Sequence, residues 1–439
     1  MKRVPLDPDL DPYALFAASR DLHPHAFLLE SLTGPERLRE YTFVGFDPEM
    51  TITYRSGVLR TNWDTMKTDR PFEALRRILE ERATPDAPGP FVGGLVGYVS
   101  FEFVHNLERV PVHLASPFPE FEFGLYLDGV IVDHVRHRAE YFSHGASRAD
   151  DLPKANGSDP AFHADPASPE GRPEEFVAAV DAARARIREG EAFQIVLSRR
   201  ERGTMSGDPL AFYEALRRIN PSPYMYYLDF GARRVIGSSP EMLLRVQGRT
   251  ATTFPIAGTR PMGSSPAETD RLAADLASDE KERAEHNMLV DLARNDLGKV
   301  CEFGSVAVPQ YMEVERYSHV QHLVSRVEGR LAQGQDALDA FAAVFPAGTV
   351  SGAPKPRAIE LIHELEGAAR GPYAGVVGYF SLNGNMDTAI AIRTLFADGP
   401  TYYLQAGAGI VADSDPVREL RETEQKLGGL KAALQEAAA

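Results

Sequence analysis

The stretch GPYAGVVGYFSLNGNMDTAIAIRTLFADGPTYYLQAGAGIVA, residues 371–412, decides the fold class of this chain. Within it, segments 371–383, 387–397 and 401–412 alternate apolar residues with small or polar ones, as paired antiparallel strands do. Short apolar runs separated by turn residues fill 27–142 in the same way. Both regions therefore predict sheet.

Helical periodicities flank these strands. One helix is predicted from Pro173 to Gly190, a second from about Asp279 to Leu297, and a third from about Pro416 to the C-terminus. The apolar stripe of the third helix is formed by Val417, Leu420, Leu427, Leu430 and Leu434. Many strands with a few long helices predict a mixed α+β class.

Residues 143–172 interrupt this regular pattern. They are rich in Ser, Asp, Pro, Gly and Ala and have no periodicity, a composition typical of a flexible linker. The sequence is therefore divided into an N-terminal region, 1–142, a linker, 143–172, and a C-terminal region, 173–439.

Composition narrows the class of protein and its partners. Apolar residues make up 43% and charged residues 25%, the balance of a globular protein. The sequence contains neither a run of 18 apolar residues nor an apolar N-terminal signal, so we expect a cytoplasmic location. A net charge of −16 argues against nucleic acid and anionic membranes as partners. A small anionic substrate would require local positive charge from a metal ion, Arg or Lys.

The single cysteine, Cys301, fits a reducing compartment. A glutaminase of the amidotransferase type needs a cysteine nucleophile on a tight turn with a histidine partner, whereas VCEFGSV, 300–306, predicts the beginning of a strand. Ammonia taken from glutamine would therefore have to be released by another chain.

Three carboxylates on predicted helices are candidate metal ligands. Glu285 lies four residues before Leu289, at the edge of a buried helix face, and Glu419 and Glu422 lie on adjacent turns of the last helix. Oxygen ligands of this kind suit Mg2+. The alternative is a pair of ordinary solvated faces, with ion pairs from Lys281 to Glu285 and from Glu422 to Lys426.

An ordered set of segments covers most of 173–435. The segments are EAFQIVLSRR (191–200), SSPEMLLR (238–245), FPIAGTRPMG (254–263), DEKERAEHNMLVDLARNDLGKV (279–300), YSHVQHLVSRVEG (317–329), FPAGTVSGAPKPRAIELI (345–362), GPYAGVVGYF (371–380), AIAIRTLF (389–396) and QAGAGIVADSDP (405–416). Taken in order, they resemble the chorismate-utilising enzyme family, which includes anthranilate, aminodeoxychorismate, isochorismate and salicylate synthases. The resemblance implies a two-layer β-sandwich with flanking helices and an active site in a cleft.

The family pattern assigns roles to particular residues. It implies Mg2+ held by Glu285 and Glu422 with Glu419 close by, although the final motif departs from the usual form at Leu420 and Arg421. The implied general acid is Glu241, with His322 positioning substrate or handling a proton. The implied contacts to substrate carboxylates are Thr349, Gly258, Thr259, Tyr373, Arg393, Gly407, Gly409 and Lys426.

Two positions distinguish the reactions of the family. Members that add water at C2 of chorismate carry Lys where this chain has Gln194, and members that attack C2 themselves often carry Lys where it has Ala257. An amine is needed to deprotonate water, whereas ammonia is already a nucleophile. We therefore expect chorismate and ammonia to give anthranilate and pyruvate, with a glutamine amidotransferase subunit as partner.

Other readings remain open at this point. Aminodeoxychorismate synthesis is the main alternative, followed by isochorismate or salicylate synthesis. A non-catalytic regulator that binds chorismate or tryptophan on the same fold is a further alternative, but such a binder would need no proton donor at the position of Glu241.

Two segments, one of them in the N-terminal region, resemble the tryptophan-feedback segments of the family. The segments are FLLESLTGPERLREYTFVGFDP, 27–48, and INPSPYMYYL, 219–228. They imply that 1–142 is regulatory and packs with the catalytic part. The implied inhibitor site for tryptophan comprises Glu30, Ser31, Pro223, Tyr224 and Met225. The alternative is a capped strand end and a turn followed by a buried aromatic strand.

Overall fold

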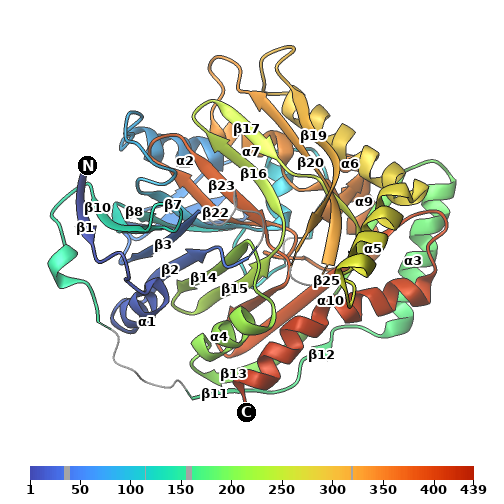
Figure 1. The fold of residues 1–439 in the computed structure, drawn as a ribbon, viewed down its shortest axis with the longest axis horizontal. Helices are drawn as coiled ribbons and strands as arrows, with labels where there is room; N and C mark the ends of the chain where they lie inside the picture. The colour runs from blue at the N-terminus through green and yellow to red at the C-terminus, as the bar shows by residue number, and fades with distance from the viewer. Residues whose placement is uncertain (34–39, 114, 155–160, 318–319) are drawn as a thin grey trace.

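Two antiparallel sheets lie face to face, and helices cover their outer surfaces (Figure 1). The computed structural model describes residues 1–33, 40–113, 115–154, 161–317 and 320–439. Parts of the predicted linker (155–160) and of two segments used for the resemblance (34–39 and 318–319) lie outside the described residues. The predicted α+β sandwich is confirmed.

The first sheet contains strands from both ends of the chain. Its order is β1 (Lys2–Leu6), β10 (Arg138–Ser143), β9 (Asp128–Asp133), β3 (Tyr41–Phe46), β2 (His25–Glu30), β14 (Tyr224–Phe230), β15 (Arg233–Ser239), β24 (Thr394–Asp398), β25 (Thr401–Ile410), β13 (Gln194–Gly207) and β11 (Phe162–Ala164). The short strands β12 (Ser168–Pro169) and β21 (Gly352–Ala353) also pair with β13.

The second sheet is built in the same mixed way. Its order is β18 (Ile256–Pro261), β20 (Val320–Arg330), β17 (Thr250–Thr253), β16 (Met242–Gln247), β23 (Met386–Ile390), β22 (Val376–Ser381), β7 (Gly94–Val99), β8 (Phe121–Tyr126), β4 (Met50–Arg55), β5 (Val58–Thr61) and β6 (Thr65–Lys67), and β19 (Ala307–Arg316) pairs with β20.

The helices are α1 (Pro12–Leu22), α2 (Pro71–Glu80), α3 (Pro173–Arg188), α4 (Leu210–Ile219), α5 (Pro266–Ser278), α6 (Glu280–Gly298), α7 (Ala337–Val344), α8 (Gly348–Ser351), α9 (Lys355–Glu366) and α10 (Pro416–Ala437), with short 3-10 turns at Phe101–Asn106 and Ala149–Asp151. Among the described residues, no helix is long and apolar enough to span a membrane.

Alternation along β2 shows how the layers form. Phe27 faces the second sheet, where its ring lies 4.7 Å from that of Tyr126, whereas Leu28 joins a separate core under α1, α4 and α10. Successive side chains of a strand point to opposite faces, so one strand contributes to both cores.

The predicted sequence regions share both sheets. Strand β2 pairs with β14, and β7 pairs with β22, so 1–142 and 173–439 alternate within each layer. Within 143–172, strands β11 and β12 pair with β13. Both sheets therefore contain strands from both sides of the boundary that the sequence predicts.

The three predicted helices are confirmed as α3, α6 and α10. Helix α10 begins with Pro416 after Asp415, whose side chain accepts a hydrogen bond from the Arg418 N–H. Its leucines pack as expected, but Val417 is 47% exposed, so its place in the stripe was wrong. The segment 300–306 leads into a strand as predicted, because β19 begins at Ala307, and the buried Cys301 forms an isolated bridge to Leu331.

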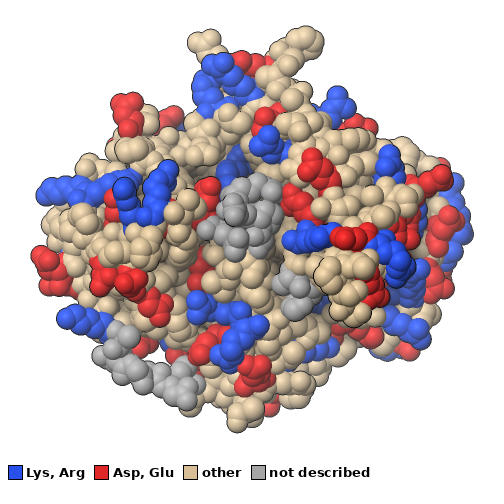
Figure 2. All heavy atoms as spheres, viewed as in Figure 1, with Lys and Arg blue, Asp and Glu red and all other residues tan. Residues whose placement is uncertain are grey.

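Charge is spread over the surface. In Figure 2, the described basic and acidic side chains on this face are interspersed.

Candidate active site

The candidate catalytic residues gather where the chain crosses between the sheets. Glu241 lies between β15 and β16, and Arg393 lies between β23 and β24. The Ile390 N–H donates to the Glu241 carbonyl at 3.0 Å, which ties the two crossings together. Arg393 has φ +51°, an uncommon value for a residue other than glycine, and its carbonyl accepts a 3.1 Å hydrogen bond from the Ser238 N–H.

Glu241 has the properties of a proton donor. Burial raises the pKa of its carboxyl from 4.5 to about 7, although Thr349, Arg393 and Lys426 act in the opposite direction. The Thr349 hydroxyl donates to Glu241 Oε1 at 2.7 Å. A substantial fraction of this carboxyl is therefore protonated at neutral pH.

Cationic and hydroxyl groups surround Glu241. The Lys426 ammonium donates to the Gly407 carbonyl at 2.9 Å. A side chain at Gly407 would meet the Tyr373 hydroxyl at 2.8 Å, so the absence of Cβ lets this buried phenol lie over the strand backbone. Burial lowers the pKa of Arg393 from its ordinary value, and the charge of Glu241 partly offsets this effect. The cluster suits a small anion.

His322, on β20, has a defined tautomer. Its Nδ1 lies 2.8 Å from the Gly258 carbonyl, and because a carbonyl can only accept, Nδ1 carries the proton and Nε2 is left as an acceptor. Thr259 Oγ1 lies 3.2 Å from the same Nδ1. Burial lowers the pKa of His322, and the charge of Arg393 adds to this, so the ring is neutral at pH 7.

Gln194 begins β13, and its side-chain amide lies over Gly409 of the neighbouring strand β25. A Cβ at Gly409 would clash with Gln194 Nε2, so only glycine allows the amide to approach the backbone here. Gln194 pairs with Ala353, which follows the α8 segment that carries Thr349. The sequence-predicted catalytic and substrate-binding residues are thus linked by a continuous set of contacts and charges.

The three candidate metal ligands form a chain of carboxylates beside this cluster. Burial raises the pKa of Glu285, and the neighbouring charge of Glu419 contributes to the rise. Burial also raises the pKa of Glu419, with a contribution from Glu422. The two ion pairs of the ordinary-helix alternative are present, Lys281–Glu285 at 3.7 Å and Glu422–Lys426 at 2.8 Å.

Among the described residues, no group of three or more His, Cys, Asp or Glu side chains is arranged to hold a metal ion. The oxygen donors nevertheless fit Mg2+, which takes few protein ligands and keeps waters. The charge of Glu419 contributes to the raised pKa of Glu285, and a cation bound near both carboxylates would offset this repulsion.

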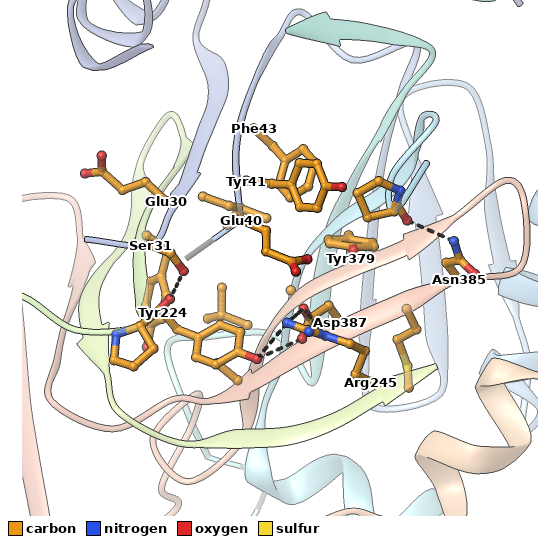
Figure 3. Close-up of a pocket in the computed structure, with 18 of the residues that line it drawn as sticks. Glu30, Ser31, Glu40, Tyr41, Phe43, Tyr224, Arg245, Tyr379, Asn385 and Asp387 are labelled. Atoms are coloured by element: carbon orange, nitrogen blue, oxygen red, sulfur yellow. Dashed lines mark hydrogen bonds and ion pairs between the residues drawn. The ribbon is translucent and has the colours of Figure 1, made fainter. Parts of the chain in front are cut away.

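A pocket of about 790 Å3 including its mouth lies between the sheets and is lined by all five residues predicted to bind tryptophan (Figure 3). Tyr41, Phe43 and Tyr379 form an aromatic wall, with ring centroids 5.9 Å and 5.6 Å apart. The Ser31 hydroxyl donates to the Pro223 carbonyl, which connects the two predicted segments.

Glu30 does not direct its carboxylate into this pocket. The carboxylate accepts from the Tyr213 hydroxyl at 2.6 Å and pairs with Arg217 at 2.8 Å. Figure 3 shows it pointing away, while Glu40 extends toward the middle of the pocket. The position of Glu30 in β2, on the face shared with Leu28, explains this direction. Its register partner Met225 is buried in the same outer core as Leu28, so the expected apolar contact of its side chain with tryptophan was wrong.

Sequence reasoning missed the polar floor of the pocket. Tyr224 donates to Asp387 at 3.1 Å, and Arg245 Nε donates to Asp387 at 2.8 Å. Glu40 was missed as well, although it precedes the strand Tyr41–Phe46 that the feedback segment contains. The pairing of Arg245 with Asp387 spans two strands, so no local sequence signal marks it.

Comparisons with known proteins show the family of this chain. A family model described as chorismate binding enzyme matches residues 24–432. The chain is 49% identical to anthranilate synthase component 1 of Methanothermobacter thermautotrophicus, covering 95% of this chain and 90% of the relative. It is 42% identical to the same component of Saccharolobus solfataricus, covering 99% of both.

A solved structure supports the same grouping. The fold matches the crystal structure of anthranilate synthase component I from Streptococcus pneumoniae with a TM-score of 0.81 and 37% identity, covering 91% of this chain and 93% of that one. Family model, relatives and solved structure extend over nearly the whole sequence. The chain therefore belongs to the chorismate binding enzyme family.

Proposed function

We propose that this chain is the anthranilate synthase component that converts chorismate and ammonia into anthranilate and pyruvate. The observation that carries the proposal is the carboxyl of Glu241, with a pKa of about 7, hydrogen-bonded by Thr349 between two cations. A binding protein needs no proton donor there. The names of relatives at 42–49% identity support the same reaction.

Protonation of the leaving hydroxyl is the first chemical requirement. The C4 hydroxyl of chorismate departs easily only as water, and Glu241 supplies that proton. Arg393, Lys426 and Tyr373 hold the substrate carboxylates, because they provide positive charge and a buried hydroxyl around the donor. Neutral His322 offers Nε2 as an acceptor for the proton lost at C2 when pyruvate is eliminated.

Ammonia is the nucleophile at C2. The Gln194 amide cannot deprotonate water, and Ala257 has no nucleophilic atom, so neither hydration nor covalent attack has a catalyst at these positions. Gln194 instead provides a carbonyl oxygen that can orient an N–H of ammonia. This assignment favours anthranilate over isochorismate and over aminodeoxychorismate.

We assign Mg2+ to Glu285, Glu419 and Glu422. The ion would supply a Lewis-acid charge that neutralises a carboxylate of the dianionic substrate. Binding requires Lys281 to leave Glu285 and Lys426 to leave Glu422, and the second exchange frees the Lys426 ammonium for the substrate. The protein donors are few, as is usual for Mg2+, which would keep several of its waters.

Ammonia comes from a separate glutamine amidotransferase subunit in this proposal. Cys301 is the only cysteine of the sequence, and burial raises the pKa of its thiol, the opposite of what a nucleophile needs. The relatives are named component 1, which agrees with a second component. The cytoplasmic location remains a prediction from the single cysteine.

Tryptophan is the proposed occupant of the pocket between the sheets. Tyr41, Phe43 and Tyr379 offer aromatic surface for an indole, above the ion pair of Arg245 with Asp387. The amine acceptor is Glu40, because the carboxylate of Glu30 is already paired with Tyr213 and Arg217.

The pocket is close to the catalytic residues along one strand. Asp387 and Ala389 on β23 line it, and the next N–H, of Ile390, donates to the Glu241 carbonyl. Tryptophan would inhibit by binding better to an arrangement of β23 in which Glu241 is misplaced, since differential affinity is what shifts such an equilibrium.

The test incubates the purified chain with chorismate, Mg2+ and an ammonium salt. Anthranilate is detected by fluorescence and pyruvate by a coupled assay, in equal amounts. Aminodeoxychorismate without pyruvate release would instead support the folate-type alternative, and isochorismate would support hydration. Absence of any chorismate consumption would refute catalysis.

A further inference from the structure

Arg370 is a buried arginine in the segment after α9 that carries no substrate-facing assignment. Its side chain is 1% exposed and forms a bidentate pair with Glu366, at 2.8 Å from Nε and 2.6 Å from Nη2. Its guanidinium lies 4.5 Å from the Phe101 ring and 5.8 Å from the Tyr373 ring. A buried charge needs such pairing to persist.

The same guanidinium holds two catalytic elements. Nη1 donates to the Val350 carbonyl at 2.7 Å, next to Thr349 on α8. Nη2 donates to the Val196 carbonyl at 2.7 Å, on the strand that begins with Gln194. Arg370 therefore connects two elements of the site. One is the segment that carries Thr349, whose hydroxyl hydrogen-bonds Glu241, and the other is the strand that begins with Gln194.

Its partners are themselves fixed. Glu366 Oε1 also accepts from the Ser198 N–H at 2.7 Å and from the Ser198 hydroxyl at 2.9 Å, so the carboxylate is anchored to β13. The backbone N–H groups of Arg370 and Gly371 donate to Glu102, at 2.6 Å and 3.0 Å. The arginine is thus held at its backbone and at its head group.

Only arginine fits these contacts. The planar head donates simultaneously in three directions: to Glu366, to Val350 and to Val196. Lysine has three donors on a single nitrogen and cannot span carbonyls on separate elements while also forming a bidentate pair.

We propose that Arg370 is a positioning residue for the reaction, which sets Thr349 against Glu241 and holds β13 beneath Gln194. The inference rests on the proposed function, in which Glu241 is the proton donor. Loss of Arg370 releases α8, so the Thr349 hydrogen bond weakens and the proton donor is misplaced. A misplacement of about 1 Å at a reacting group costs about 100-fold in rate.

The experiment compares Arg370→Lys with Arg233→Lys as a matched control. Arg233 forms a similar bidentate pair with the buried carboxylate of Glu122, at 2.7 Å and 2.6 Å, at the opposite end of β15 from Glu241. Measured quantities are kcat, KM for chorismate, the melting temperature, and the alkaline limb of kcat/KM. Glu366→Gln serves as a milder variant that loosens the arginine without removing it.

Arg370→Lys should lower kcat roughly 10- to 100-fold, with a smaller change in KM. The alkaline limb should move to higher pH, because the Thr349 hydrogen bond lowers the Glu241 pKa while Arg393 and Lys426 remain in place. Arg233→Lys should lower the melting temperature only. Thr349→Val should move the limb in the same direction, and Arg370→Lys should add little to it, because both act on one contact.

Two results would overturn the proposal. One is that Arg370→Lys has a lower melting temperature while its kcat and the alkaline limb of its kcat/KM keep their wild-type values. The other is limb shifts of Arg370→Lys and Thr349→Val that simply add. If Arg370→Lys does not fold, Glu366→Gln must show a smaller shift of the same sign, and an unmoved limb refutes the role. Wild type without anthranilate formation would refute the proposed function instead.

Discussion

Replacing Glu241 by Gln removes an ionisable proton while keeping the size of the side chain. The pKa of Glu241 rises on folding from 4.5 to about 7, so between these values the folded chain holds a proton that the unfolded chain has lost. The stability due to this group is complete below pH 4.5 and is lost as the pH rises through 7. The difference corresponds to about 3 kcal/mol at most. Partial exposure of the side chain reduces it to about 1–3 kcal/mol.

Gln is neutral at every pH, so Glu241→Gln should escape this loss. Urea unfolding at about pH 5 and about pH 8 should show that the free energy of unfolding falls with pH by about 1–3 kcal/mol more in wild type than in the variant. Glu102, whose pKa burial also raises to about 7, titrates in both proteins and cancels. Anthranilate formation by the variant should fall roughly 10²- to 10⁴-fold. Equal pH-dependent losses in the two proteins, or full activity of the variant, would refute the reasoning.

Four further outcomes are expected. Glu285→Gln and Glu422→Gln should each abolish turnover with an unchanged melting temperature, and EDTA should do the same to wild type; full activity in EDTA contradicts the metal assignment. Gln194→Lys should lower anthranilate formation and let an isochorismate-like product accumulate, so unchanged ammonia kinetics count against the role of Gln194. Cys301→Ser should keep ammonia-dependent activity, and glutamine-dependent turnover by the pure chain would disprove the need for a partner subunit. Ser31→Phe should weaken inhibition by tryptophan while sparing catalysis, because it breaks the bond to Pro223 and fills the pocket; a wild type insensitive to millimolar tryptophan would end the feedback proposal.

Local periodicity predicted the helices and strands but not how far the surfaces that pack against them extend. The stripe of α10 is correct for Leu427, Leu430 and Leu434, which are buried, and wrong for Val417. Spacing tells which residues share a helix face. It does not tell where the surface that covers this face ends, so the first turn of the helix was misjudged.

The candidate site depended on residues that are distant in sequence. Glu241 and Arg393 come together because two crossings between the sheets are adjacent, which no spacing reveals, so their association was inferred from the family resemblance. Strand alternation could have corrected Glu30, since it shares a face with Leu28 and not with Leu29. The multiple contacts of Arg370 could not have been predicted, because its carbonyl partners have no side-chain signature.

The alternation of early and late strands within each sheet has a consequence for synthesis on the ribosome. Strand β7 is complete at Val99, but its partner β22 begins only at Val376, about 280 residues later. Because translation adds about 5–20 residues per second, roughly 14–55 s pass between the synthesis of β7 and that of β22. During that time the nascent chain presents open strand edges, the surfaces most prone to pairing with other chains. Chaperone capacity during translation, and not only the stability of the finished fold, should therefore limit the yield of this protein.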